Sequence, residues 1–199
     1  MMLAGGLLLP LATIAAPCNT FGSSWKTYTN AELGVALCHP AQWVVQAEGK
    51  DIYVRKRPFP PLKPTLTRKN NVDLLLNGKR VLDPNDYIAH FRFGRGDFTA
   101  ANNKEVIFID DQGAVRAGIG RFNNPKALIA RAHGWSGYKT EIVCSTIDPK
   151  NGFHAAGGQC LWIVASDGQR NFVLDTQGNP ADISVSWKIA KSLRFIPAS

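Results

Sequence analysis

Short apolar runs separated by glycine-containing turns fill the second half of the chain, and this pattern favours a β fold. Glycine occurs 18 times and proline 12 times in 199 residues, while long runs of helix-forming residues are scarce. Turn sequences such as Asp111-Gln112-Gly113 lie between the runs, where they connect consecutive strands. The strands expected here cover residues 106–109, 114–122, 139–147, 159–166 and 171–176.

Three further strands are expected in the first half of the chain, at residues 25–29, 35–38 and 43–45. Three helices are also expected, each beginning near an Asp-Pro or Asn-Pro pair, a combination typical of a helix start. They cover residues 83–91, 126–132 and 180–190. The expected fold is therefore α/β (α+β), with an antiparallel twisted sheet flanked by helices.

Residues 1–16 have the composition of a secretion signal. They contain no charged side chain and end at two small residues, Ala15 and Ala16. An apolar segment of ~7–15 residues before small residues is typical of an export signal. We therefore expect residues 17–199 to form a single domain that is periplasmic or secreted. A buried N-terminal helix and a lipid anchor at Cys18 are the competing interpretations, and Pro17 weakens the second because a small residue normally precedes a lipidated cysteine.

The four cysteines form two pairs that are each local in the sequence. An even number of cysteines in an exported chain indicates disulfide bonds. The turn sequence at residues 148–152 predicts a hairpin that places Cys144 opposite Cys160, so we expect these two to be bonded. Cys18 would then pair with Cys38. Four buried thiols in a cytosolic protein are the alternative.

Positive charge is concentrated in residues 50–104, which hold 12 Lys or Arg and 5 Asp or Glu within a chain of net charge +8. Four prolines between residues 58 and 64 exclude a helix there and favour an extended, exposed loop. Such a basic, proline-rich insertion would attract an anionic partner, although a merely solvated loop is the alternative. The partner-binding residues expected on it are Arg55, Lys56, Arg57, Phe59, Lys63, Arg68 and Lys69.

Two stretches resemble the Mog1/PsbP-like group of α/β proteins. The stretch near the N-terminus resembles the opening strands of this fold and consists of Tyr28, Asn30, Gly34, Val35, Leu37, Pro40 and Trp43. The stretch near the C-terminus, residues 189–195, resembles the helix end that closes the fold. The resemblance implies a sheet covered by helices and an accessory or binding role, and it assigns no catalytic residue. The chain departs from the group at Cys38-His39, where an aromatic residue often precedes the proline, and in the basic region, which has no counterpart.

Side chains that could carry chemistry do not form a recognisable motif. The histidines, His39, His90, His133 and His154, have no metal-ligand spacing. The sequence Gly134-Trp135-Ser136-Gly137 lacks the glycine spacing of a nucleophile elbow. We therefore assign no catalytic, cofactor-binding or metal-binding residue.

These observations favour a non-enzymatic exported protein-binding module that holds an acidic protein partner. A periplasmic inhibitor of the immunity type, bound to a toxin enzyme, is the concrete form of this hypothesis. An envelope accessory protein that binds anionic lipid or a membrane assembly is the first alternative, and a hydrolase of envelope polymers is the second. Nucleic acid is not an expected partner, because no nucleic-acid-binding motif is recognised.

Overall fold

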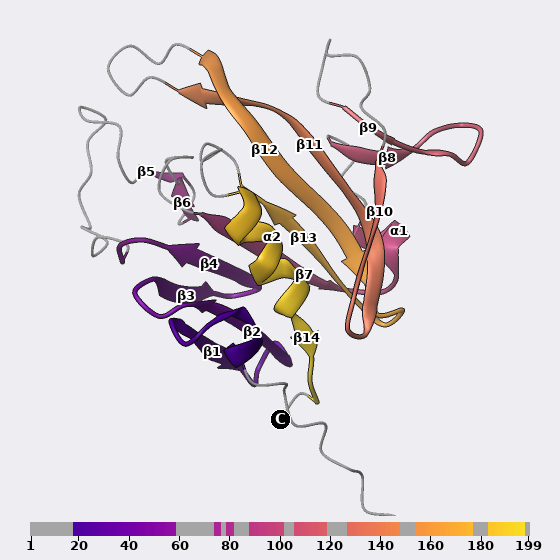
Figure 1. Cartoon of the computed structure of the whole chain (residues 1–199). Helices are drawn as coiled ribbons and strands as arrows, with labels where there is room; N and C mark the ends of the chain where they lie inside the picture. The colour runs from indigo at the N-terminus through magenta and orange to yellow at the C-terminus, as the bar shows by residue number, and fades with distance from the viewer. Residues whose placement is uncertain are drawn as a thin grey trace, which may run out of the picture.

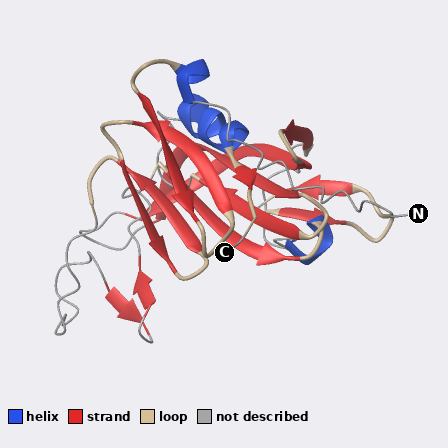
Figure 2. Cartoon of the chain, turned by 90° about the horizontal axis from the view of Figure 1, so that it is seen from below, coloured by secondary structure: helices blue, strands red, loops and turns tan. Residues whose placement is uncertain are grey.

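A computed structural model describes residues 18–58, 74–76, 79–81, 88–101, 106–118, 127–147, 154–176 and 183–197. These residues form mostly antiparallel β-sheet with two short α-helices (Figures 1 and 2). In chain order the elements are η1 (Cys18–Phe21), β1 (Trp25–Asn30), β2 (Val35–Pro40), β3 (Val44–Glu48), β4 (Asp51–Arg55), β5 (Leu74–Leu76), β6 (Lys79–Val81), β7 (Ala89–Arg95), α1 (Phe98–Ala101), β8 (Ile107–Ile109), β9 (Val115–Ala117), β10 (Leu128–Ala132), β11 (Trp135–Ile147), β12 (His154–Ser166), β13 (Arg170–Asp175), α2 (Ile183–Ser192) and β14 (Arg194–Phe195).

The largest sheet has the strand order β10-β11-β12-β13-β7-β4-β3, and each neighbouring pair in it is antiparallel. A second sheet has the order β1-β2-β14, and β5–β6 and β8–β9 form separate two-stranded pairs. The long hairpin of β11 and β12 extends beyond the rest of the sheet (Figure 1).

Alternating side chains give the central strands two different faces, because successive residues of a strand point to opposite sides. On one face, Ile52, Phe91 and Leu174 are opposite each other across β4, β7 and β13, and all three are fully buried. The second sheet and α2 pack against this face and complete the main core, to which they contribute Leu37 and Ile189 among others.

The opposite face carries a second, smaller core at its β11–β12–β13 end. Ile107 of β8 and Ala117 of β9 pack there against Trp162 and Val164 of β12, and Phe98 of α1 joins them at the edge. The large sheet is therefore covered on both sides over these strands, which explains why β12 is buried along most of its described length.

The strand pattern predicted from the sequence is confirmed for most of the described residues, and so is the C-terminal helix, α2. The helix predicted at residues 126–132 is wrong, because β10 occupies that stretch. The helix predicted at residues 83–91 is also wrong for its described part, where β7 begins at Ala89. In β7, Phe91 and Phe93 alternate with His90 and Arg92, and this two-residue period places the phenylalanines in the core.

Among the residues that the structure describes, helices cover less of the sheet than expected, since α1 has 4 residues and α2 has 10. The predicted β11–β12 hairpin is present, but Cys160 lies opposite Ile142, and the register shifts between Val143 and Ser145. The predicted register is therefore wrong by two residues.

The expected signal at residues 1–16 lies outside the described residues. Within the described ranges, no helix has both the length and the apolar character needed to cross a membrane.

Candidate functional site

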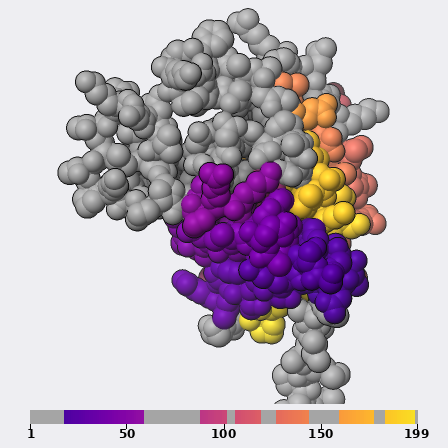
Figure 3. Space-filling view, turned by 60° about the vertical axis from the view of Figure 1, so that its left-hand side comes forward, coloured from indigo at the N-terminus to yellow at the C-terminus, as the bar shows by residue number. Residues whose placement is uncertain are grey.

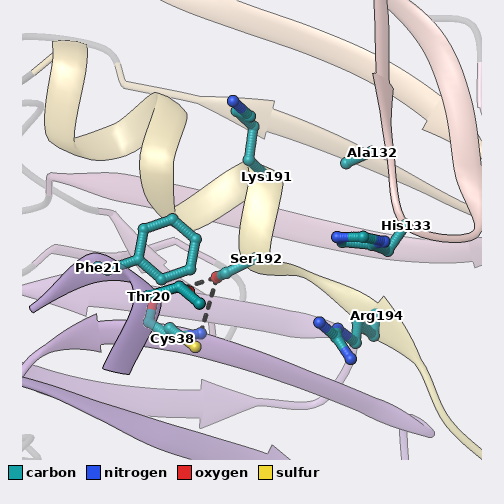
Figure 4. Close-up of a pocket in the computed structure, with 8 residues that line it drawn as sticks. All are labelled: Thr20, Phe21, Cys38, Ala132, His133, Lys191, Ser192 and Arg194. Atoms are coloured by element: carbon teal, nitrogen blue, oxygen red, sulfur yellow. Dashed lines mark hydrogen bonds between the residues drawn. The ribbon is translucent and has the colours of Figure 1, made fainter. Parts of the chain in front are cut away.

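A pocket of about 390 Å³ lies where three separate parts of the chain meet. The N-terminal segment η1 and strand β2 form one wall, the end of α2 and β14 form another, and the turn between β10 and β11 forms the third (Figure 4). In the space-filling view, surfaces from these three parts of the chain adjoin one another (Figure 3). The lining residues are Thr20, Phe21, Cys38, Ala132, His133, Lys191, Ser192 and Arg194.

The N-terminal wall is held in place by a disulfide bond between Cys18 and Cys38, whose Cα atoms are 5.6 Å apart. This pairing confirms the prediction made from the sequence. The bond attaches η1 to β2, so that Thr20 and Phe21 remain beside the end of α2. The ring of Phe21 also lies against Trp25, with 5.2 Å between the ring centroids.

Hydrogen bonds connect the C-terminal wall to each of the other two walls. The buried Ser192 hydroxyl accepts a hydrogen bond from the backbone N–H of Cys38 at 2.8 Å and donates one to the carbonyl of Ile189 at 2.6 Å. The indole N–H of Trp135, directly after the β10–β11 turn, donates to the carbonyl of Leu193 at 3.1 Å. His133 of the turn and Arg194 of β14 thus line the same pocket.

The charged groups of the lining are all basic. Lys191 and Arg194 are cationic, His133 supplies at least one ring N–H donor, and no aspartate or glutamate lines the pocket. None of the three forms an ion pair with another described residue. This lining makes the pocket suited to an anionic group such as a carboxylate or phosphate, which would accept charge-assisted hydrogen bonds there.

Two more lysines, Lys139 and Lys188, extend the positive charge beyond the pocket. The Lys139 ammonium of β11 lies 4.6 Å from the ring centroid of Trp187, and the Lys191 ammonium lies 5.9 Å from the same centroid. Lys188 is exposed on the same helix. The last turn of a helix favours cations, because the unpaired carbonyl groups at its end carry partial negative charge. This preference explains the position of Lys191 in α2.

A second cluster of titratable groups lies in the large sheet, away from the pocket. His90 of β7 is only 6% exposed, and its Nε2 lies 2.7 Å from Asp51 of β4. Its Nδ1 lies 3.0 Å from a carboxylate oxygen of Asp175 in β13. Tyr53 stacks on the imidazole with 4.4 Å between the centroids. His90 therefore connects three neighbouring strands.

The two carboxylates determine the charge of His90. Burial alone would lower its pKa, but the hydrogen bonds and charges of Asp175 and Asp51 outweigh burial and raise the pKa to about 9. For Asp51, burial acts to raise the pKa, yet the hydrogen bond and charge of His90, together with Arg92, lower it overall. Burial and the nearby carboxylates raise the pKa of Tyr53. Both ring nitrogens of His90 are engaged by acids, so this imidazolium has no free nitrogen to act as a base.

The basic region is placed only in part. Arg55 was expected on an exposed loop, but it is the last residue of β4, lies opposite Val44 in the ladder and is only 2% exposed, so that expectation is wrong. Lys56 and Arg57 are exposed, and the Lys56 ammonium lies 5.9 Å from the ring of Trp43. The remaining predicted residues lie outside the described part of the chain: Phe59, Lys63, Arg68 and Lys69.

The remaining cysteines and histidines have separate environments. Cys160 is disulfide-bonded, whereas the side chain of Cys144, its predicted partner, lies outside the description. His39 is buried and donates to the carbonyl of Pro40 at 2.9 Å, and burial lowers its pKa. The side chain of His154 also lies outside the described residues. Among the residues that are described, no group of three or more His, Cys, Asp or Glu side chains is placed to hold a metal ion.

Comparisons with known proteins do not assign the chain to a family. No protein-family model matches it, and no curated protein sequence matches it. A crystal structure from Bacteroides thetaiotaomicron VPI-5482 is similar with a TM-score of 0.41 and 10% sequence identity, over 85% of this chain and 48% of that one. The chain thus spans about half the length of that protein.

Proposed function

We propose that this chain is a non-enzymatic, extracytoplasmic binding module that holds an acidic protein partner through its basic pocket. The observation that carries the proposal is the pocket lining, which contains Lys191, Arg194 and His133 and no carboxylate. A carboxylate side chain of a partner would receive charge-assisted hydrogen bonds there, and these are stronger than neutral ones. Lys56 and Arg57, both exposed, add positive charge that would attract the same partner from a distance.

The disulfide supports an extracytoplasmic location. Such bonds form and persist in oxidising compartments and are rare in the cytosol. The Cys18–Cys38 bond also builds one wall of the pocket, so that the proposed site would be assembled in the compartment where the partner is met.

Two side chains that could carry chemistry are engaged in hydrogen bonds with other groups of the protein. The Ser192 hydroxyl is buried and directs its proton to the backbone, so it is poorly placed to act as a nucleophile. The imidazole of His90 is held between two carboxylates. A periplasmic inhibitor of the immunity type, with a toxin enzyme as the acidic partner, remains the specific form of the proposal.

The Mog1/PsbP-like assignment is part of the same proposal. The two stretches that resemble this group lie side by side, because β14 pairs with β2 through Arg194 and Ala36. The Ser192–Cys38 hydrogen bond joins the same two stretches. Both contribute to the pocket, which suits the binding role that the resemblance implies.

The proposal can be tested with a fluorescein-labelled hexaglutamate peptide. We expect binding at low salt that is largely lost in ~0.5 M salt, where exposed charges are screened. The double variant Lys191→Ala/Arg194→Gln should bind about ten-fold or more weakly, since contacts to charged groups each contribute about 1.5–3 kcal/mol. The matched control is Lys26→Ala/Lys50→Ala, which removes two exposed charges outside the pocket.

Equal losses in the two double variants would refute the pocket as the binding site. A parallel measurement with vesicles containing anionic phosphatidylglycerol separates the alternative partner. Binding to the vesicles, without binding to the peptide, would favour the envelope accessory role over the protein-binding role.

A further inference from the structure

We propose that the open edge of β10 binds an extended segment of the acidic partner as an added β-strand, with the acidic end of that segment seated in the basic pocket. This inference rests on the proposed function and specifies the form of the partner. Its basis is the position of β10, which ends the strand order of the large sheet in the described part of the chain. An edge strand presents backbone N–H and C=O groups that a further strand can pair with.

The side chains of β10 are unusually apolar for a solvent-facing edge. Leu128 is 57% exposed and Ile129 is 64% exposed, the two highest values among the large hydrophobic residues described. Sheet edges exposed to solvent are normally protected by charges, prolines or a bulge. Adjacent residues of a strand point to opposite faces, so an added strand would find an apolar contact on each side.

The hairpin register identifies the backbone groups that face the open edge. Ala132 pairs with Trp135 across the two-residue turn formed by His133 and Gly134, where the φ of Gly134 is 82°. The residues that close a two-residue hairpin exchange both hydrogen bonds, and the bonded pairs then alternate along the ladder. Ala132, Ala130 and Leu128 therefore bond to β11, while Ile129 and Arg131 direct their backbone groups outward.

The basic pocket fixes which end of β10 the acidic end of the segment meets, and the pairing pattern of the sheet gives the direction of the added strand. The C-terminal end of β10 leads directly to the pocket, since Ala132 and His133 line it beside Lys191 and Arg194. Arg131, which is exposed on the same edge, adds another positive charge. Because every neighbouring pair in this sheet is antiparallel, we infer antiparallel addition, which places the N-terminal end of the partner segment at the pocket. The ligand class is an extended peptide with acidic residues followed by alternating apolar residues.

A seven-residue labelled peptide tests this arrangement. It carries two N-terminal glutamates followed by alternating threonine and valine, and its affinity is measured by fluorescence anisotropy. The matched peptide has the same sequence with the backbone nitrogens methylated at alternate positions, which removes strand hydrogen bonds and leaves the charge unchanged. The backbone nitrogens can be methylated in either of two alternating sets. We expect methylation of the set that faces β10 to weaken binding about ten-fold or more. A third peptide, with the glutamates at the C-terminal end, should bind more weakly than the first.

Amide hydrogen exchange and variants of the protein provide a second measurement. The amides of Ile129 and Arg131 should exchange at least ten-fold more slowly when the first peptide is bound. The variant Ile129→Ser should weaken binding several-fold, whereas Val143→Ser, which changes a 41% exposed residue of β11, should not. Both replaced residues are exposed, so neither variant depends on repacking the core.

The outcomes separate this inference from the function on which it rests. If hexaglutamate binds in the pocket but methylation in either set changes nothing and the two amides gain no protection, strand addition is wrong and the basic pocket stands. If hexaglutamate itself does not bind, the proposed function is wrong and this inference falls with it. Equal binding of the forward and reversed peptides would overturn the antiparallel arrangement.

Discussion

The charge of His90 makes the stability of the protein depend on pH in the alkaline range. Its pKa is raised from an ordinary value of 6.5 to about 9 by Asp175 and Asp51, which outweigh the opposing effect of burial. A folded-state pKa above the unfolded value means that the native protein binds the proton more tightly. The stabilisation is therefore fully present below pH 6.5 and is lost as the pH rises through about 9.

The size of the loss follows from the shift in pKa. Each pKa unit corresponds to ~1.4 kcal/mol, so a rise of the pKa from 6.5 to about 9 contributes roughly 3–4 kcal/mol to the free energy of unfolding. This is a large part of the stability of a typical domain, ~5–15 kcal/mol. We expect the free energy of unfolding to fall by roughly this amount between pH 5.5 and pH 9.5.

Denaturation by urea, followed by tryptophan fluorescence at a series of pH values, measures this change. The variant His90→Gln removes the titrating group and should be less stable at pH 6, with a flatter pH profile. The variant Asp51→Asn keeps His90 but removes one of its two acids, so the midpoint of the alkaline decline should move to lower pH. If the wild type and His90→Gln lose the same free energy between pH 6 and pH 9, the coupling of His90 to the two carboxylates is refuted.

Three further changes test the packing of the described residues. Gly137→Ala should lower the free energy of unfolding by about 1–3 kcal/mol, because a Cβ there would lie 2.5 Å from the Cα of Ala165; unchanged urea denaturation would contradict this. Replacing Cys18 and Cys38 by alanine should cost about 3 kcal/mol, since the bond spans 20 residues, and it should also weaken hexaglutamate binding; anisotropy that matches the wild type would show that the bond does not shape the pocket. Arg170→Met should lower the melting temperature by several degrees, because this guanidinium donates to the carbonyls of residues 34 and 196; calorimetry that shows no change would remove its role in holding the C-terminal strand.

Local sequence patterns predicted most of the strands, because the apolar run and the turn residues that mark a strand lie next to one another in the sequence. The run that forms β12 is apolar and bounded by turns, and the cap sequence before α2 combines with the helical spacing of Ile183, Trp187 and Ala190. Where the prediction was wrong, a local signal was outweighed by pairing with distant strands. β7 lies between β4 and β13, and this position decides its conformation despite the helix-start sequence before it.

The sequence could not predict the His90 cluster or the surroundings of Arg55. Asp51 and Asp175 lie 39 and 85 residues from His90, so only the order of the strands brings the three together. A histidine near the start of an alternating strand, on the face opposite Phe91, was the only local signal. Arg55 belonged to a basic run that looked solvent-exposed, yet β4 continues through it and buries it.

The pocket illustrates how a disulfide can serve a site without taking part in its chemistry. Cys38 is bonded to Cys18, and the backbone N–H of the same residue donates to Ser192 at the end of α2. One residue of β2 therefore connects the N-terminal wall to the C-terminal wall. Lys191 and Arg194 flank two buried residues, Ser192 and Leu193, so this anchor holds the backbone from which both cations extend. Loss of the bond should therefore release Thr20 and Phe21 from the pocket before it disturbs the main core, because Val35 and Leu37 hold β2 in that core independently of the disulfide.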